Sequence, residues 1–217
     1  MDKKAFNIIY MYAILSNMTH SIKQAIEKFR GLGSTFHTRE ALQLGVHTRT
    51  LYALRDSGVL EMLSRGVYRM TEQGPLSNPD LVTVASRVPQ GVICLVSALS
   101  FHDLTTQIPH RVSIALCRTM RNPAIKYPPL TVYRYDEHCF QAGIEEHLID
   151  GVVVKIYCPE KTLVDCFKFR NKIGMDIVLE ALKRYREHQQ FKIKELLMYA
   201  AVCRVEKVMK PYLEALT

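Results

Sequence analysis

The stretch Thr38–Met70, TREALQLGVHTRTLYALRDSGVLEMLSRGVYRM, decides the fold of the first part of this chain. A short helix is predicted to begin at Thr38, whose hydroxyl can accept a backbone N–H of the first turn. Gly45 suits the left-handed residue that ends such a helix. A second helix is predicted at about Thr48–Ser57, and Gly58 follows its end. We therefore expect two short helices joined by a tight turn.

The second helix is followed by a pattern typical of a small β-ribbon. Leu51 and Leu54 lie three residues apart, so they share one face of the helix and can pack inward. Two short strands are predicted at 60–63 and 67–70. The turn 64–66 between them reads Ser-Arg-Gly, which places a basic residue at the tip of the ribbon.

A third helix is predicted upstream at 21–30, where apolar residues recur at the i, i+3, i+4, i+7 spacing of an amphipathic helix. Three helices followed by a ribbon are typical of a winged helix-turn-helix, whose second helix enters the DNA major groove. A purely structural or protein-binding winged helix is the alternative. DNA binding is favoured because arginines fall on the second helix and the ribbon, namely Arg49, Arg55, Arg65 and Arg69.

Composition supports a polyanionic partner. The 217 residues carry a net charge of +8, with 48% hydrophobic and 23% charged residues, which is ordinary for a globular protein. Residues 1–79 hold ten basic against six acidic residues, and residues 80–217 hold 19 against 15. The excess of basic over acidic residues is therefore not confined to the first domain, and a second basic surface near the C-terminus is possible.

The six cysteines are scattered, and none forms a C-x-x-C pair. They are interpreted as small core residues of a protein in a reducing, cytoplasmic compartment, with no metal and no cofactor expected. Residues 1–20 form a charged start followed by a short apolar run, which resembles a secretory signal but lacks a clear cleavage site. A packing or dimerising helix, or an upstream start codon before Met18, is the preferred interpretation, and no membrane span is expected.

A Pro- and Gly-rich linker at 72–79 separates the winged helix-turn-helix at 21–74 from a second domain at 80–217. Asp150-Gly151 between two β-prone runs is the sequence signal of a type I′ hairpin. The domain is predicted to be α+β, a small antiparallel sheet followed by helices. The strands are expected at 111–117, 130–135, 144–149 and 152–157. The helices are expected at 80–87, 97–104, 159–171, 174–188, 193–201 and 204–216.

No catalytic motif is visible in the second domain, and an enzyme is not expected. A two-metal nuclease needs a D/E-x-K triplet on a strand, and the candidate strand offers Val153-Val154-Lys155, without the carboxylate. His102 is interpreted as structural rather than catalytic. The basic run Lys168, Arg170 and Lys172 is interleaved with phenylalanines, which indicates either a solvated helix face or a nucleic-acid contact.

Four blocks carry a resemblance to a known family, and together they span Phe36 to Thr217. They are the winged-helix stretch, VPQGVICLVSALSFHDLTTQIP, GIEEHLIDGVVVKIYCPEKTLVDCFKFRNKIG and CRVEKVMKPYLEAL. The chain resembles the AbiEi family, the antitoxins of type IV abortive-infection toxin–antitoxin systems, which act in phage defence. Residues 1–20 extend beyond the pattern.

The resemblance implies a winged helix-turn-helix followed by an antitoxin domain. It implies a transcriptional autorepressor that binds inverted repeats in its own promoter as double-stranded DNA, as a monomer or weak dimer that pairs there. It also implies that the protein counters a nucleotidyltransferase toxin without a stable complex. The chain lacks the G-S and D-x-D signature of the toxin itself.

The resemblance also implies a DNA surface, in which Arg49 and Thr50 read bases and Arg65 and Arg39 clamp phosphates. The full set implied is Thr38, Arg39, His47, Thr48, Arg49, Thr50, Tyr52, Arg55, Arg65 and Arg69. The weaker candidates for antitoxicity are Lys168, Arg170, Lys172, Arg204 and Lys207.

Two other functions stay open on the residues. One is a winged-helix regulator with a ligand- or protein-binding C-terminal domain. The other is a nucleic-acid enzyme whose nuclease-like domain has degenerated, against which the missing carboxylate argues.

Overall fold

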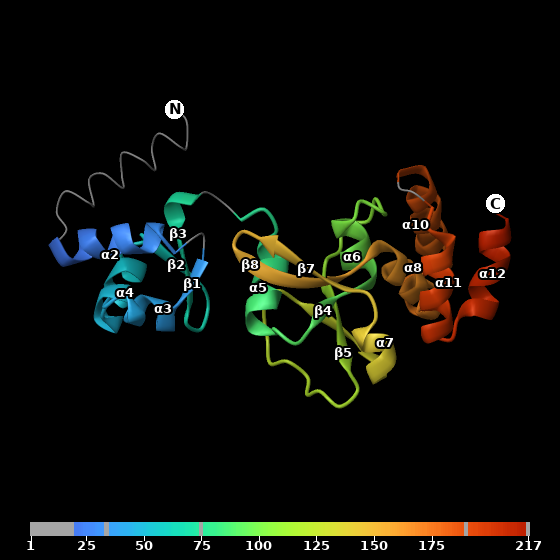
Figure 1. The fold of residues 1–217 in the computed structure, drawn as a ribbon, viewed down its shortest axis with the longest axis horizontal. Coiled ribbons are helices and arrows are strands. Elements are labelled where there is room, and N and C mark those ends of the chain that lie inside the picture. The colour runs from blue at the N-terminus through green and yellow to red at the C-terminus, as the bar shows by residue number, and fades with distance from the viewer. Residues whose placement is uncertain (1–19, 33–34, 74–75, 189–190, 216–217) are drawn as a thin grey trace. The chain divides into compact units, whose positions relative to one another are not determined.

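The computed structural model describes residues 20–32, 35–73, 76–188 and 191–215. The chain divides into two compact units, which we treat separately (Figure 1). Unit 1 comprises residues up to 87 together with 148–152, and unit 2 comprises 88–147 and 153–217. The extension predicted at 1–20 lies outside the described residues, apart from His20. No helix among the described residues has the length and apolar character to cross a membrane.

Unit 1 contains the predicted helices and ribbon, together with one strand that the sequence did not predict. Its sheet has three strands in the order β1-β3-β2, with both pairs antiparallel. The elements are α2 (His20–Arg30), β1 (Thr35–His37), α3 (Thr38–Gln43), α4 (Thr48–Asp56), β2 (Leu60–Ser64), β3 (Val67–Met70), the 3₁₀ turn η1 (Thr71–Gln73) and α5 (Pro79–Arg87).

The helix ends of unit 1 follow local chemistry. Gly45 and Gly58 take positive φ angles of 75° and 76° just after α3 and α4, as their positions predict. The cap of α3, however, is His37 rather than Thr38, and the His37 backbone N–H donates to Glu40 Oε2 at 2.6 Å. Pairing of β1 with β3 fixes His37 in extended geometry, so the helix starts one residue after it.

The core of unit 1 lies between the helices and one face of this sheet. Phe29 stacks on Phe36 with ring centroids 4.4 Å apart, which joins α2 to β1. Leu51 and Leu54 of α4 are fully buried, as predicted, whereas Leu42 is 48% exposed. The buried apolar residues of this core are Ala25, Ile26, Phe29, Phe36, Ala41, Val46, Leu51, Leu54, Val59, Leu60, Tyr68 and Met70.

Unit 2 is built on a five-stranded sheet with the order β6-β5-β4-β8-β7. The α+β class predicted from the sequence is confirmed. The strands are β4 (Val92–Ile93), β5 (Val112–Cys117), β6 (Leu130–Tyr135), β7 (Ile144–Ile149) and β8 (Val152–Tyr157). The tip of the β7–β8 hairpin, residues 148–152, is the part counted with unit 1. The helices are α6 (Leu95–Phe101), α7 (Glu137–Gln141), α8 (Pro159–Lys168), α9 (Arg170–Ile173), α10 (Met175–His188), α11 (Ile193–Val202) and α12 (Glu206–Glu214).

The sheet is mixed in direction rather than wholly antiparallel as expected. β4 pairs with β5 antiparallel, whereas β5 pairs with β6, and β4 with β8, in parallel. A parallel neighbour needs a long crossover, and residues 118–129 supply one between β5 and β6. At the hairpin between β7 and β8, Asp150 and Gly151 both have positive φ, at 49° and 79°, which is the geometry of the type I′ turn predicted there.

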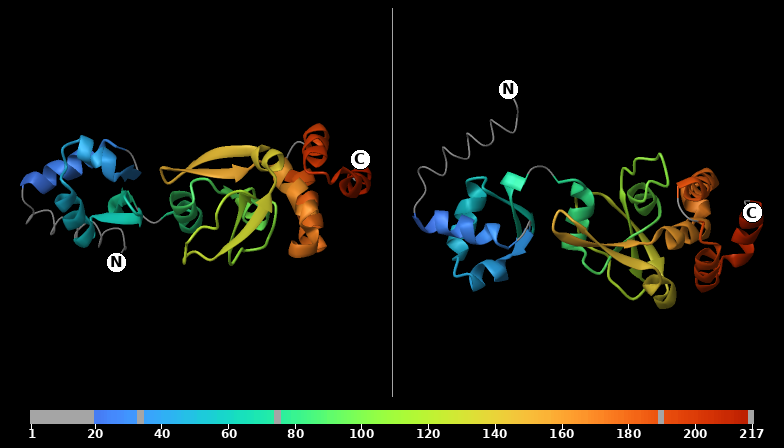
Figure 2. Two further views of the ribbon diagram at one scale, coloured as in Figure 1. Left: turned by 90° about the horizontal axis from the view of Figure 1, so that it is seen from below. Right: turned by 45° about the horizontal axis from the view of Figure 1, so that its top comes forward.

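The helices from residue 159 onward gather at one end of unit 2 (Figure 2). Among them α8 is the central element, because it packs against α6, α10 and α11. Every α8 residue from Glu160 to Phe167 is buried, including charged Lys161 and Asp165. The predicted helix 159–171 is interrupted at Phe169, which has φ −103° and separates α8 from α9.

Candidate nucleic-acid interface

The exposed face of α4 is the centre of the candidate interface. Because Leu51 and Leu54 point into the core, the opposite face presents residues 49, 52, 53 and 56 at the spacing of adjacent helical turns. Arg49 is exposed near the N-terminus of the helix, and the ring of Tyr52 is 47% exposed. Thr48 and Thr50 are half-buried beside this face. The face therefore offers an arginine, two hydroxyls and an aromatic ring.

The start of α4 is fixed by His47. Its Nδ1 accepts the backbone N–H of Arg49 at 3.2 Å, as an N-cap side chain does. The ring is exposed, so His47 holds the helix end while it faces solvent. Sequence reasoning predicted its place on the surface but not its capping role.

Arg55 is held by its own neighbours. Its Nε and Nη2 donate to Asp56 Oδ1 at 2.9 and 2.7 Å, and its guanidinium lies 5.1 Å from the centre of the Tyr52 ring. These hydrogen bonds to Asp56 raise the pKa of Arg55. A phosphate would have to compete with Asp56 for this side chain, so Arg55 is a weaker candidate than Arg49.

The wing, which is the ribbon formed by β2 and β3, is hydrogen-bonded to the start of α3. The backbone N–H of Thr38 donates to the Gly66 carbonyl at 2.8 Å, and its hydroxyl donates to the same oxygen at 3.3 Å. Gly66 has φ +79°, and a Cβ there would lie 3.2 Å from Thr38 Oγ1. Thr38 thus positions the turn that carries exposed Arg65. Exposed Arg39 follows Thr38 on α3.

Arg69 differs from the other members of the predicted DNA surface. It lies on β3, the central strand of the three, and is only 3% exposed. Its Nε is 3.9 Å from Glu61 Oε2 on β2. Its place on the ribbon led us to expect an exposed arginine, but all four residues of β3 are buried.

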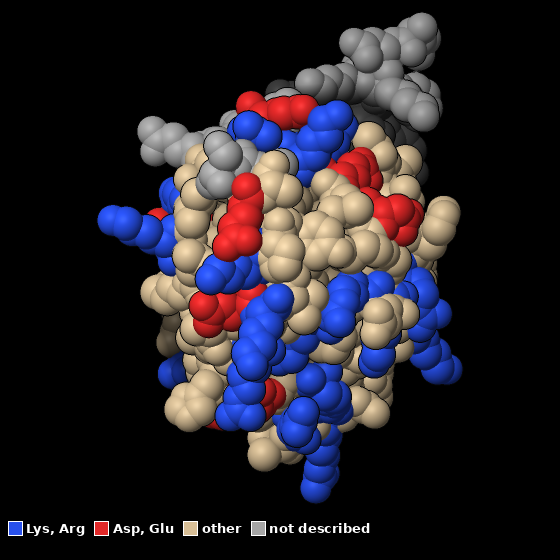
Figure 3. Space-filling model, turned by 90° about the vertical axis from the view of Figure 1, so that its right-hand side faces the viewer, with Lys and Arg blue, Asp and Glu red and all other residues tan. Residues whose placement is uncertain are grey.

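The candidates for antitoxicity fall into two groups. Lys168 Nζ is 3.4 Å from Cys139 Sγ and 5.6 Å from the centre of the Tyr135 ring, and Lys172 Nζ lies 5.7 Å from the Phe169 ring. Arg170 donates to the Phe167 carbonyl at 2.9 Å. Arg204, with φ +58°, and Lys207 are exposed where α11 gives way to α12. Lys and Arg side chains gather on the face of the molecule that carries the C-terminal helices (Figure 3).

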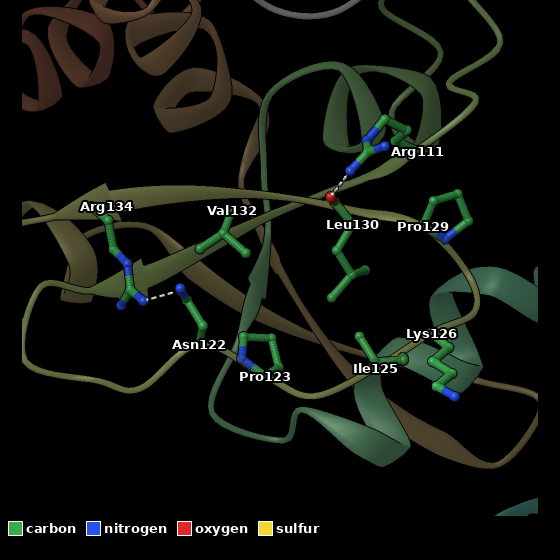
Figure 4. A pocket seen from close by; sticks show the side chains of 9 residues that line it. All are labelled: Arg111, Asn122, Pro123, Ile125, Lys126, Pro129, Leu130, Val132 and Arg134. Atoms are coloured by element: carbon green, nitrogen blue, oxygen red, sulfur yellow. Dashed lines mark hydrogen bonds between the residues drawn. The ribbon is translucent and has the colours of Figure 1, made fainter.

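A hollow of about 620 Å³ lies beside β6 in unit 2 (Figure 4). Arg134 and Arg111 lie at its two ends and form hydrogen bonds with the surrounding chain. Arg134 donates to the Met120 carbonyl at 2.7 Å and to Asn122, and Arg111 donates to the Leu130 carbonyl. The residues around the hollow are Arg111, Asn122, Pro123, Ile125, Lys126, Pro129, Leu130, Val132 and Arg134. A small anionic molecule would meet basic side chains on an apolar floor.

His102 has the structural role predicted for it. Its Nε2 is 2.8 Å from the Tyr157 carbonyl, and burial lowers its pKa. The residues with metal-ligating atoms close together lie elsewhere: Cys139, Asp165 and Cys203 bring these atoms within 4.8 Å of one another in the described part of the chain. Sequence reasoning missed this group because its members come from three separate helices or helix ends.

In comparisons with known proteins, a family model matches part of unit 1 and a solved structure matches most of the chain. Residues 23–71 match the family model described as a transcriptional regulator, AbiEi antitoxin. This match confirms, for residues 23–71, the resemblance found in the sequence. No curated protein matches the sequence. Among solved structures, the RV2827C protein from Mycobacterium tuberculosis matches with a TM-score of 0.54 and 14% identity, over 88% of this chain and 78% of that one. At this identity the match speaks to the fold alone.

Proposed function

We propose that this protein is a type IV antitoxin that represses its own operon by binding double-stranded DNA at inverted repeats in its promoter. The observation that carries the proposal is the exposed face of α4, which lies inside the segment that matches the antitoxin regulators. A helix with a buried leucine side and an outward arginine, threonine and tyrosine side has the form of a major-groove reader. The net charge of +8 favours association with a polyanion.

Within this proposal the residues divide by role. Arg49 and Thr50, in the first turn of α4, read base edges, and a bidentate arginine–guanine pair is worth about 1–3 kcal/mol of discrimination. Arg65 on the wing and Arg39 on α3 contact phosphates and set the register. Thr38 and His47 position these elements through the contacts described above. Arg69, being buried, supports the wing rather than reading DNA.

The second half of the proposal concerns unit 2. It counters a nucleotidyltransferase toxin in the cytoplasm, without forming a stable complex with it. We assign this activity to the exposed basic residues of the C-terminal helices and their junctions, among them Lys172, Arg204 and Lys207. The protein is a monomer or weak dimer that pairs on its operator.

DNA binding is tested by fluorescence anisotropy with the protein's own upstream duplex and a scrambled duplex across a salt series. Tight binding to the native duplex alone supports an operator reader. Arg49→Ala should weaken binding to the native duplex more than to the scrambled one. Arg65→Ala should weaken both equally and reduce the log–log salt slope by about 0.9 for the phosphate contact it loses. Lys183→Ala, on an exposed part of α10, is the matched control. Equal, weak binding to both duplexes would refute the repressor role.

Antitoxicity is tested separately by co-expression with the nucleotidyltransferase toxin that the proposal expects to be encoded beside this gene. The Arg49→Ala/Arg65→Ala variant should still rescue growth, and Lys172→Glu/Lys207→Glu should not. Failure of the wild-type protein to rescue growth would refute the antitoxin role while leaving the DNA-binding result intact.

The hollow beside β6 favours one alternative, a winged-helix regulator that senses a small anionic ligand in unit 2. A screen of nucleotides and organic acids by thermal shift tests it. A ligand that raises Tm in the wild type, but not in Lys126→Ala, would favour the alternative, provided that it also changes operator affinity.

A further inference from the structure

Two cysteines that are 64 residues apart in sequence meet inside unit 2. Cys139 lies on α7, and Cys203 caps the C-terminus of α11. Their sulfur atoms are 2.7 Å apart, close enough that one thiol donates to the other, and both side chains are buried. A disulfide requires two cysteines whose side chains the fold already brings side by side. This pair meets that requirement with little movement.

The charges around the pair favour a reactive thiolate at Cys139. Lys168 Nζ is 3.4 Å from Cys139 Sγ, and the ammonium group of Lys161 is buried close by. The two thiols lie within hydrogen-bonding distance of each other, and either can be the donor. Thiolates, not thiols, attack oxidants, so we assign Cys139, the cysteine beside the Lys168 ammonium group, as the nucleophile and Cys203 as the resolving partner.

A metal is the competing explanation for this cluster, because Asp165 supplies a third ligand atom. One feature argues against it. Lys161 Nζ already lies 2.6 Å from Asp165 Oδ2 and provides the positive charge that a cation would bring.

We propose that Cys139 and Cys203 form a reversible disulfide in response to peroxide. The Cys139 thiolate attacks one oxygen of hydrogen peroxide, which breaks the O–O bond, leaves a sulfenic acid and releases hydroxide. The sulfur of Cys203 then attacks the sulfenic sulfur, and the sulfenic oxygen takes the Cys203 proton and leaves as water. The hydroxide from the first step combines with the proton that Cys139 lost when it ionised, which gives the second water. Overall, two thiols and one peroxide give one disulfide and two waters.

The disulfide would tie α7 to the junction between α11 and α12. Arg204 follows Cys203 directly, with φ +58°, and Lys207 lies in the first turn of α12. Oxidation would therefore fix the segment that begins α12 against the body of unit 2. Because the cross-link closes a long loop, it should also raise resistance to heat.

The test is mass spectrometry of the purified full-length protein after treatment with hydrogen peroxide and then an alkylating agent. We expect the loss of two hydrogens, a Cys139–Cys203 cross-linked peptide, a rise in Tm, and reversal of all three by dithiothreitol. Cys203→Ser should instead leave Cys139 as a sulfenic acid that dimedone traps. Cys158→Ala, a buried cysteine whose thiol has a raised pKa, is the control and should still form the cross-link.

Three results would overturn the proposal. The first is that both thiols stay fully alkylatable after peroxide treatment. The second is that Cys139 pairs with another cysteine. The third is that the isolated protein carries stoichiometric zinc, released when Cys139 and Cys203 are modified, since that would make the cluster a metal site.

Discussion

Replacing Lys161 by Met should strongly destabilise unit 2. Lys161 and Asp165 are fully buried at i,i+4 spacing on α8, with 2.6 Å between Nζ and Oδ2. The ammonium also lies 4.2 Å from the centre of the Tyr157 ring and 5.0 Å from that of Tyr135. Removing the lysine leaves a carboxylate in an apolar core without its counter-ion.

The size of the effect follows from burial. Breaking a buried ion pair by removing one partner typically costs about 3–5 kcal/mol, because the remaining charge is uncompensated. A domain's whole stability is about 5–15 kcal/mol, so the variant should be close to unfolding at ordinary temperature. Burial already raises the pKa of Asp165. Without Lys161 that carboxyl should take up a proton still more readily, so the loss should shrink as pH falls toward the ordinary carboxyl range.

The assay is urea unfolding followed by far-UV circular dichroism. Lys183→Met is the matched control, because Lys183 and Glu187 have the same i,i+4 spacing but side chains 76% and 53% exposed. An exposed helical pair contributes only about 0.3–0.5 kcal/mol. Lys161→Met/Asp165→Leu, which removes both charges, should recover most of the loss. If Lys161→Met and Lys183→Met shift the midpoint equally, the reasoning from burial is refuted.

Three other predictions test the structure at separate points. Gly143→Ala should destabilise the protein strongly, because Gly143 has φ +71° and an added Cβ would lie 2.6 Å from Lys161 Cβ. Gly58→Ala is the control: Gly58 has φ +76° and nothing within 4 Å of an added Cβ, so only the left-handed strain of about 1–2 kcal/mol should be lost. Equal losses of stability in thermal melts of the two variants would contradict this. Asp136→Ala should cost about 1 kcal/mol at neutral pH because Asp136 caps α7. The hydrogen bond from the Cys139 N–H lowers the pKa of Asp136 in the folded protein below its unfolded value. The stability that Asp136 contributes is therefore present above the unfolded pKa and is lost as pH falls through the folded pKa. If the wild type and Asp136→Ala still differ in stability in acid, the charge of Asp136 is not involved. Arg69→Ala should lower the free energy of unfolding in urea, because Arg69 is buried. Arg49→Ala should leave that free energy within about 0.5 kcal/mol of wild type, because Arg49 is exposed. A larger loss for Arg49→Ala than for Arg69→Ala would place Arg69 on the surface.

Local sequence signals predicted most of unit 1. Leucine spacing located α4, glycines marked the ends of α3 and α4, and the Ser-Arg-Gly turn located the wing. β1 was missed because three residues carry no visible alternation, and its strand exists only through pairing with β3. That pairing also explains why Arg69, now on a central strand, is buried rather than displayed.

In unit 2 the strand positions were predictable and their pairing was not. The Asp-Gly turn predicted the β7–β8 hairpin because both of its residues accept positive φ. Nothing local could indicate that β6 returns parallel to β5, since that direction is set by the path of residues 118–129. For the same reason Lys161 could not be distinguished from a solvated helix lysine: its partners Tyr135 and Tyr157 come from different strands.

The buried ion pair has an explanation beyond stability, because such pairs are often no more stabilising than apolar residues of the same shape. Lys161 connects α8 to the sheet: it contacts Asp165 on its own helix, the Tyr135 ring on β6 and the Tyr157 ring on β8. The thiol of Cys203 lies 3.7 Å from the other oxygen of Asp165, so α11 joins the same network. A misplaced helix would leave at least one charge unpaired, and the network therefore penalises wrong arrangements of α8 and α11. Cys203 also lies beside Cys139, so the residues that define the packing of unit 2 hold together the two thiols that we propose form a disulfide.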